Sequence, residues 1–197
     1  GDKLRCLHSK YVHYDSPDER GIDVALLYDS TQVKVLNSKP LHVDLQGDNT
    51  RDILYTSVLI HGHDTLHTMV CHLPSVLGGE TATEWKRYVS KQLIQQQIDS
   101  ILNLQPNAKI VVMGDMNCEP KNDLRGLNNM MIKQSGTEQG THKYQGRWSC
   151  LDQFYLSSAL APRANAHIFS PKWLLEEDTK YLDNKPKRTY IGYRYHD

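Results

Sequence analysis

Short hydrophobic runs recur along most of this 197-residue chain, separated by polar stretches rich in Gly, Asp and Asn. Alternation with a period near two, or a short continuous apolar run, is typical of β-strands. Strands are predicted at residues 22–28, 33–36, 53–60, 66–72, 109–114 and 151–156, with a further short one at 166–169. The tetrapeptide His61-Gly62-His63-Asp64 between two of these runs predicts a hairpin turn.

One segment has helical instead of strand-like spacing. Ile94, Ile98 and Ile101 recur three or four residues apart, which predicts a long amphipathic helix at residues 83–103. Thr81 and Glu84 fit a capping box at its start, and Pro106 would end it. Strand, helix and strand in succession predict a mixed α/β fold. No repeat or linker interrupts the chain, so we expect one domain over residues 1–197.

Composition narrows the class of protein. With 39% hydrophobic and 23% charged residues, the chain suits a soluble globular domain, and no apolar run is long enough to cross a bilayer. Lys plus Arg equals Asp plus Glu, so the net charge is zero and nothing indicates a protein that holds nucleic acid by charge alone. A nuclease stays open, because local patches matter more than the sum.

The cysteines and the first residue bear on the compartment. The four cysteines are widely spaced and lack the CxxC pattern of a zinc site, which favours scattered free thiols over two disulfides. Because the chain begins with Gly1 instead of Met, a cytoplasmic and a secreted location both stay open.

The strongest chemical signal is Gly114-Asp115-Met116-Asn117, directly after a buried strand. If the extended conformation persists, the side chains of Asp115 and Asn117 point to one side. A carboxylate and an amide there can contact a divalent cation, a phosphate oxygen or a water nucleophile. An ordinary turn explains these four residues equally well when they are taken alone.

Two further strands carry a polar residue near an end. His72 could donate a hydrogen bond to a phosphate oxygen, although a histidine satisfied by backbone groups is the commoner case. Asp152 could orient a histidine as the aspartate of a catalytic triad does, or form a buried salt bridge or cap. His61, His63 and His67 cluster around the hairpin, but His63 falls in the turn, so a solvated hairpin tip is favoured over zinc.

Taken together and in order, these motifs resemble the bacterial branch of the endonuclease/exonuclease/phosphatase superfamily. Met116 stands where that family usually has Phe, and Val76-Leu77 stand where basic residues are common. Each match alone is weak, whereas the ordered set is fairly specific. The matching segments are residues 20–28, 72–75, 111–117, 148–154 and 188–193.

The resemblance implies a four-layer α/β/β/α sandwich of the DNase I type that hydrolyses phosphate esters by attack of water at phosphorus. Asp115 and Asn117 would position the water and the phosphate and would hold a metal, usually magnesium, with manganese as the alternative. His72 would bind a phosphate oxygen, and Asp152 would orient a second, late histidine. The substrate could be a nucleic acid, a phospholipid head group or a small phosphoester, and the enzyme a phosphodiesterase, a nuclease or a phosphatase.

Two departures from the family pattern modify this expectation. The family's last motif is Ser-Asp-His, whereas this chain closes with Tyr195-His196-Asp197, and nothing before Arg20 matches the family's Asn and metal-binding Glu. The chain is therefore expected to be a fragment, incomplete at both ends and nearly inactive by itself. The alternative is a degenerate family member that acts as a binding module. A partial sandwich would also expose apolar sheet surface and self-associate.

Overall fold

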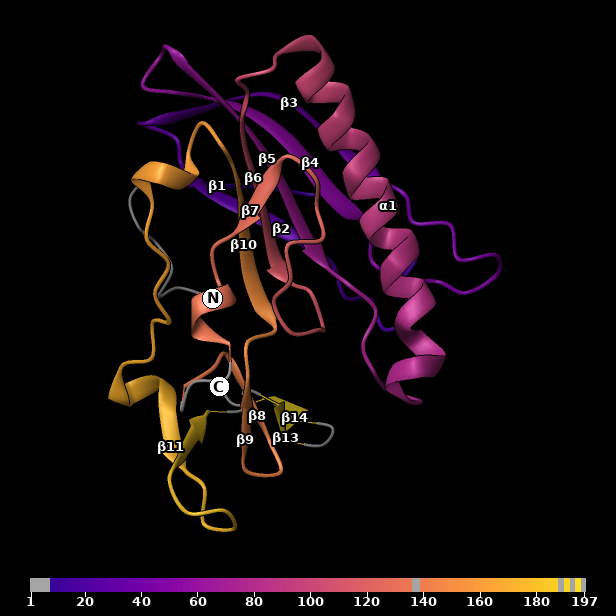
Figure 1. Cartoon of the computed structure of the whole chain (residues 1–197), viewed down its shortest axis with the longest axis vertical. Coiled ribbons are helices and arrows are strands. Elements are labelled where there is room, and N and C mark those ends of the chain that lie inside the picture. Colours follow the sequence, from indigo (N-terminus) through magenta and orange to yellow (C-terminus); the bar gives the residue numbers. More distant parts are fainter. Residues whose placement is uncertain (1–7, 136–138, 188–189, 192–193, 196–197) are drawn as a thin grey trace.

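The computed structural model describes residues 8–135, 139–187, 190–191 and 194–195. Its centre is a six-stranded sheet (Figure 1), and all neighbouring strands are antiparallel except β5 and β6, which are parallel. In spatial order the strands are β3 (Val33–Leu41), β4 (Ile53–Ile60), β5 (Asp64–His72), β6 (Lys109–Asp115), β10 (Asp152–Ser157) and β7 (Leu127–Asn129). The mixed α/β prediction is confirmed, as are the predicted strands at 53–60, 66–72, 109–114 and 151–156, within two residues at their ends.

The parallel pair β5 and β6 is connected by α1 (Glu80–Leu104), which covers one face of the sheet (Figure 1). Ile94 and Ile98 are fully buried against that face, in one core with Met69, Ile110 and Val112. Burying such side chains is the main term that holds the helix to the sheet, at roughly 1.5–3 kcal/mol for each large aliphatic group. The strand–helix–strand unit thus rests on the periodicity seen in the sequence.

The start of α1 differs from the prediction. Gly79 is the N-cap, at φ 109°, and no side chain caps the helix there. The capping box predicted at Thr81 and Glu84 is therefore wrong, because the helix begins at Glu80 and Thr81 already lies in its first turn. The hydroxyl of Thr83 donates to the carbonyl of Gly79 over 2.9 Å instead. The helix ends before Pro106, as predicted.

A two-stranded ribbon of β1 (Ser9–His13) and β2 (Ala25–Asp29) lies on the other side of the sheet from α1 (Figure 1). Tyr14, which follows β1, and Val24, which precedes β2, line a small cleft together with Leu54 of β4. Leu54 points away from α1, since its neighbours Ile53 and Tyr55 belong to the helix-side core. The strand predicted at 22–28 is β2, displaced by up to three residues, and the one predicted at 33–36 extends to Leu41.

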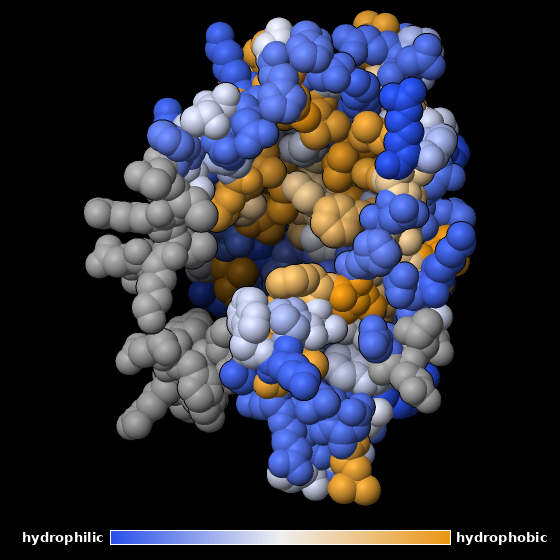
Figure 2. All heavy atoms as spheres, turned by 90° about the vertical axis from the view of Figure 1, so that its left-hand side faces the viewer, coloured by the Kyte–Doolittle hydropathy of each residue, from blue (hydrophilic) through white to orange (hydrophobic). Residues whose placement is uncertain are grey.

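Among the described residues, no other strand or helix covers the rest of this far face. Val70, Met113 and Phe154 are register partners on β5, β6 and β10, and they point away from the helix-side core. Phe154 is 46% exposed. Figure 2, which faces this side of the molecule, shows a hollow lined by apolar residues. The sheet is therefore closed by α1 on one face and only partly covered on the other.

Smaller elements gather beyond the end of the sheet where β10 begins (Figure 1). They are three two-stranded ribbons, in which β8 pairs with β9, β11 with β12 and β13 with β14, and two short 3₁₀ helices, whereas a third 3₁₀ helix, Ala161–Arg163, follows the other end of β10. The predicted strand at 166–169 is wrong, because that segment runs as irregular chain between two 3₁₀ helices. The ribbons are β8 (His142–Tyr144), β9 (Arg147–Ser149), β11 (Leu175–Glu177), β12 (Asn184–Pro186), β13 (Tyr190–Ile191) and β14 (Arg194–Tyr195), and the 3₁₀ helices are Ile132–Gln134, Ala161–Arg163 and Lys172–Leu174.

Two further expectations concern single features. Within the described ranges, no helix has the length and apolar character that a membrane crossing requires. Cys71, Cys118 and Cys150 are free thiols, as the spacing favoured, and Cys6 lies outside the described residues.

Candidate active site

Three polar side chains from three strands stand in one row at one edge of the sheet. His72 ends β5, Asp115 ends β6, and Asp152 begins β10. The register pairs His72 with Asp115 and Asp115 with Asp152. Parallel β5 and β6 bring their carboxyl ends together, and antiparallel β10 adds its amino end to the same edge. Directly paired residues share a face of the sheet, so the row belongs to one site.

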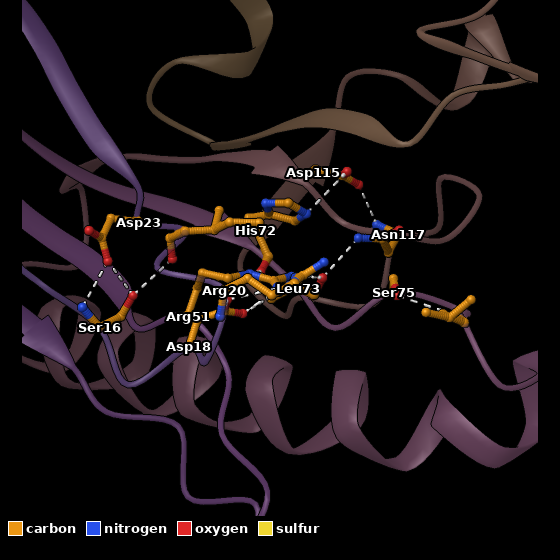
Figure 3. Close-up of polar contacts among 12 residues, drawn as sticks. Ser16, Asp18, Arg20, Asp23, Arg51, His72, Leu73, Ser75, Asp115 and Asn117 are labelled. Atoms are coloured by element: carbon orange, nitrogen blue, oxygen red, sulfur yellow. Dashed lines mark hydrogen bonds and ion pairs between the residues drawn. The ribbon is translucent and has the colours of Figure 1, made fainter. Parts of the chain in front are cut away.

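The row lies on the open face of the sheet. His72, Asp115 and Asp152 each lie two residues from the apolar row of Val70, Met113 and Phe154, and side chains two apart point to the same face. The side chains of His72 and Asp115 are about one-third exposed, at 33% and 31%. Nε2 of His72 is 3.7 Å from Oδ2 of Asp115 (Figure 3). The two groups are thus within direct electrostatic contact and still open to a ligand.

Gly114 allows β5 and β6 to approach each other at this edge. Its φ of 133° is strained for any other residue, and a Cβ atom there would lie 1.8 Å from the carbonyl oxygen of Cys71. The glycine of the Gly-Asp-x-Asn motif is therefore required by close packing of two backbones. It places Asp115 directly beside His72.

Asn117 does not continue the extended conformation. Its φ is 48°, so the extended conformation, on which the predicted common orientation of Asp115 and Asn117 depended, does not persist to Asn117. The chain turns instead, and Oδ1 of Asp115 accepts a hydrogen bond from the Asn117 amide over 2.8 Å. Aspartate stabilises such a turn through a bond to the backbone two residues on. Asn117 is only 8% exposed, and its Nδ2 donates to the carbonyl of Leu73 over 2.8 Å.

The surroundings of Asp115 and His72 favour the neutral form of each side chain. Burial raises the pKa of Asp115, and the Asp152 carboxylate adds to this, whereas the Asn117 amide, His72 and His142 oppose it. Burial also lowers the pKa of His72, and the nearby Arg51 and Arg20 act in the same direction. A carboxyl group with a raised pKa beside a second carboxylate can accept a proton, and the pair attracts a cation.

A buried arginine at this site escaped the sequence analysis. Arg51 is 4% exposed, and its guanidinium donates to the carbonyls of His72 (3.1 Å, from Nε) and Leu73 (2.9 Å, from Nη2). Its Nη1 contacts the carboxylate of Asp18 at 2.9 Å (Figure 3). Burial opposes ionisation of Asp18, but hydrogen bonds from Arg51 and Arg20 outweigh it and lower its pKa to about 2. No sequence signal marks Arg51, which precedes β4 like many surface arginines.

Gln153 is a second residue whose role the sequence hid. It is fully buried beside the exposed Asp152, and its Nε2 donates to the carbonyls of Cys118 (2.5 Å) and Cys150 (3.1 Å). Its Oε1 accepts from the side-chain amide of Asn129 over 2.8 Å. A polar residue at an inward position of an apolar strand was the available signal. Gln153 fastens β10 to the segment that follows Asn117.

The remaining candidates lie elsewhere. The hairpin histidines do not gather around one point, since His67 contacts the hydroxyl of Tyr55 and Nδ1 of His63 contacts the carbonyl of His61. In the described part of the chain, one group of three potential metal ligands lies within 4.8 Å, formed by exposed His13, Asp15 and Asp23, so the row itself has no such group. Arg188, His196 and Asp197, from the expected last motif, lie outside the described residues.

Comparison with known proteins bears on this geometry. The sequence model of the Endonuclease/Exonuclease/phosphatase family matches residues 1–197. The fold is similar to the human Nocturnin catalytic domain with bound sulfate (TM-score 0.57, 17% identity) and truncated Caenorhabditis elegans TDP2 (0.59, 16%). It is also similar to ANGEL2, described as a 2',3'-cyclic phosphatase (0.60, 10%). Each match covers 77% of this chain and 62–63% of the other, and curated proteins gave no significant match.

Proposed function

Because this chain belongs to the Endonuclease/Exonuclease/phosphatase family, we propose that it carries part of the active site of a metal-dependent phosphate-ester hydrolase. The observation that supports this most directly is the row of His72, Asp115 and Asp152 at one sheet edge. ANGEL2 is a 2',3'-cyclic phosphatase, and Nocturnin was solved with a bound sulfate, an anion of phosphate's shape and charge. Because the chain spans about 62% of those proteins, the whole activity stays a proposal.

In the proposed reaction the oxygen of a water molecule forms a new bond to phosphorus as the ester P–O bond breaks, and the leaving alkoxide takes a proton from solvent. Asp115 orients this water and accepts its proton, for which a raised pKa is favourable near neutral pH. His72 donates a hydrogen bond to a non-bridging phosphate oxygen. Asn117 holds the turn that aims Asp115, and its amide oxygen is available to the phosphate or the metal. Asp152 adds negative charge and would orient a second histidine.

Asp115 and Asn117 are the proposed metal ligands, with magnesium or manganese as the ion. Magnesium is commonly bound by one or two carboxylates, with water completing six positions. Asp115, Asn117 and the facing Asp152 offer such a partial oxygen set. Burial, with a smaller contribution from the Asp152 carboxylate, raises the pKa of Asp115, and a bound cation would stabilise its ionised form. When bound, the ion would neutralise charge that develops on the phosphate oxygens.

The test is turnover of bis-p-nitrophenyl phosphate, a generic chromogenic phosphodiester, with and without magnesium. We would assay this chain and a longer form extended at both ends. The proposal expects metal-stimulated turnover by the longer form that Asp115→Asn abolishes. Absence of metal-stimulated turnover on phosphodiester and phosphomonoester substrates alike would count decisively against it.

The alternative is a binding module that holds a phosphate-bearing ligand without hydrolysis. It is favoured by the row itself, which in the described residues does not bring three metal-ligating atoms within 4.8 Å. Calorimetric titration with inorganic phosphate separates the two. Binding that depends on His72, with no turnover in the longer form, supports the module.

The open apolar face supports a proposal of self-association with a second copy of this chain. Val70, Met113 and Phe154 form an uncharged row, and Figure 2 shows the apolar hollow around this side. Like apolar surfaces are complementary to each other, and exposed patches of this kind are usually covered. Light scattering on a size-exclusion column should give a mass above 22.6 kDa that Phe154→Glu returns to the monomer value. A monomeric profile for the unaltered chain contradicts it.

A further inference from the structure

One buried guanidinium joins the segments that carry the candidate catalytic residues. Arg51 lies just before β4, 21 and 22 positions from the two carbonyls that it contacts, those of His72 and Leu73. Its third partner, Asp18, is 33 positions away and 6% exposed at its side chain. Taking such a charge out of water is costly unless it is paired and hydrogen-bonded. Arg51 meets both conditions, so its cation is held in one orientation.

The backbone of Leu73 contacts both Arg51 and the Gly-Asp-x-Asn turn. The carbonyl of Leu73 accepts from Nη2 of Arg51 over 2.9 Å and from Nδ2 of Asn117 over 2.8 Å. The amide of Leu73 donates to the backbone carbonyl of Asp115 over 2.8 Å. The His72 carbonyl, the Leu73 amide and the Leu73 carbonyl are therefore each hydrogen-bonded to a residue of another segment. Figure 3 shows the side chains of Arg51 and Asn117 meeting at Leu73.

We infer that Arg51 is a positioning residue that holds the peptide of residues 72–73 and thereby sets His72 and Asn117 against Asp115. Asp18 orients the guanidinium through its contact with Nη1. The catalytic consequence of this arrangement rests on the proposed function, whereas the structural part does not. Arg51 touches none of the proposed reacting atoms.

The geometry requires arginine instead of any cation. A guanidinium presents five donors in a rigid plane, so it can serve two carbonyls and a carboxylate together. A lysine ammonium is a single point and cannot reach all three sites in the same way. Misplacing a catalytic group by about 1 Å costs on the order of 100-fold in rate. Arg51→Lys keeps the charge and removes the fork, which isolates positioning from electrostatics.

Arg87 provides a matched control. It is also 4% exposed, and it donates to the carbonyls of Pro74 and Glu80 and to the hydroxyl of Thr83, without touching His72 or Leu73. Arg87→Lys therefore also replaces a buried guanidinium by an ammonium group, beside the loop that follows β5. Both variants are made in this chain and in the longer form, and unfolding in urea reports their stability.

The first readout is hydrogen exchange of the Leu73 amide, measured relative to the amide of Val112 in the centre of β6, which reports global opening. In Arg51→Lys the Leu73 amide should exchange at least ~10-fold faster relative to Val112, because its local opening is no longer restrained. In Arg87→Lys the ratio should stay within about two-fold of the unaltered protein. Asp18→Asn, which keeps the shape and removes the charge, should move the ratio in the same direction by less.

The second readout is kinetic, in the longer form. Arg51→Lys should lower kcat by roughly 10- to 100-fold with little change in KM, and Arg87→Lys should leave kcat nearly unchanged. An unchanged exchange ratio in Arg51→Lys overturns the inference, and so does an equal loss of kcat in both variants. If the unaltered protein hydrolyses no phosphate ester, the proposed function fails, and the exchange ratio alone decides the role of Arg51.

Discussion

His72 and Asp115 are register partners on neighbouring parallel strands, and Nε2 of the one lies 3.7 Å from Oδ2 of the other. They are 43 positions apart in the chain, so only the pairing of β5 with β6 brings them together. Burial favours the neutral form of both side chains, with opposite effects on their pKa values. A neutral imidazole beside a carboxyl group that can take a proton suits hydrolysis near neutral pH.

We expect substitutions in this row to reduce turnover without unfolding the chain. Asp115→Asn removes the proton acceptor, and His72→Gln weakens the phosphate contact, so each should lower kcat/KM of the longer form by about 100- to 1,000-fold. Asp64→Asn is the control, since Asp64 begins β5 at the opposite end of the strand and pairs with Lys109. The measurement is steady-state hydrolysis of the chromogenic diester. Equal losses in the control would show that the effect is general.

Removal of divalent metal should abolish turnover. Excess EDTA is expected to stop hydrolysis by the longer form, and added magnesium or manganese to restore it. Calorimetric titration gives a second readout, in which Asp115→Asn weakens magnesium binding by at least about ten-fold. Full activity in excess EDTA would rule out a metal-dependent mechanism.

Gly114 should be intolerant of any side chain. In Gly114→Ala the new Cβ meets the Cys71 carbonyl oxygen at 1.8 Å and φ is 133°, so we expect a loss of at least ~3 kcal/mol or failure to fold. Gly62→Ala is the control, because φ is 80° there but no atom lies within 4 Å, and it should cost only about 1 kcal/mol. Urea unfolding measures both. Similar losses for the two would contradict the close approach of β5 and β6.

Stability should fall in acid through Asp18. Hydrogen bonds from Arg51 and Arg20 outweigh burial and lower its pKa from 3.8 to about 2 in the folded state. A group whose folded pKa is depressed stabilises the protein above its unfolded pKa, and this contribution is lost as pH falls through the folded value. The loss should therefore occur between about pH 4 and pH 2.

Urea unfolding across that pH range tests this expectation. Asp18→Asn should be less stable near pH 6 and should lose less stability between pH 4 and pH 2 than the unaltered chain. Asp48→Asn, which removes a more exposed acid that pairs with Lys86, is the matched control. If the free energy of unfolding of Asp18→Asn changes with pH as much as that of the unaltered chain, the Asp18–Arg51 pair does not govern stability in acid.

Several elements followed from local pattern alone. Runs such as residues 53–60 and the isoleucines of α1 carry their period in the sequence, because a strand or helix with one buried face must repeat at that interval. The Gly-Asp-x-Asn motif identified the end of β6 and hence the position of Asp115. The start of α1 was missed, since a glycine cap depends on backbone conformation and carries no side-chain signal.

The tertiary structure decided how these elements combine into a site. The turn at Asn117 depends on a hydrogen bond to Asp115 and on a partner at Leu73, 44 positions away, which no local period encodes. Arg51 is an ordinary residue in the sequence, and only folding buries it between His72 and Asp18. Period and propensity are properties of neighbours along the chain. Register, burial of charge and the meeting of strand ends are set by contacts between distant segments, so they exist only in the folded chain.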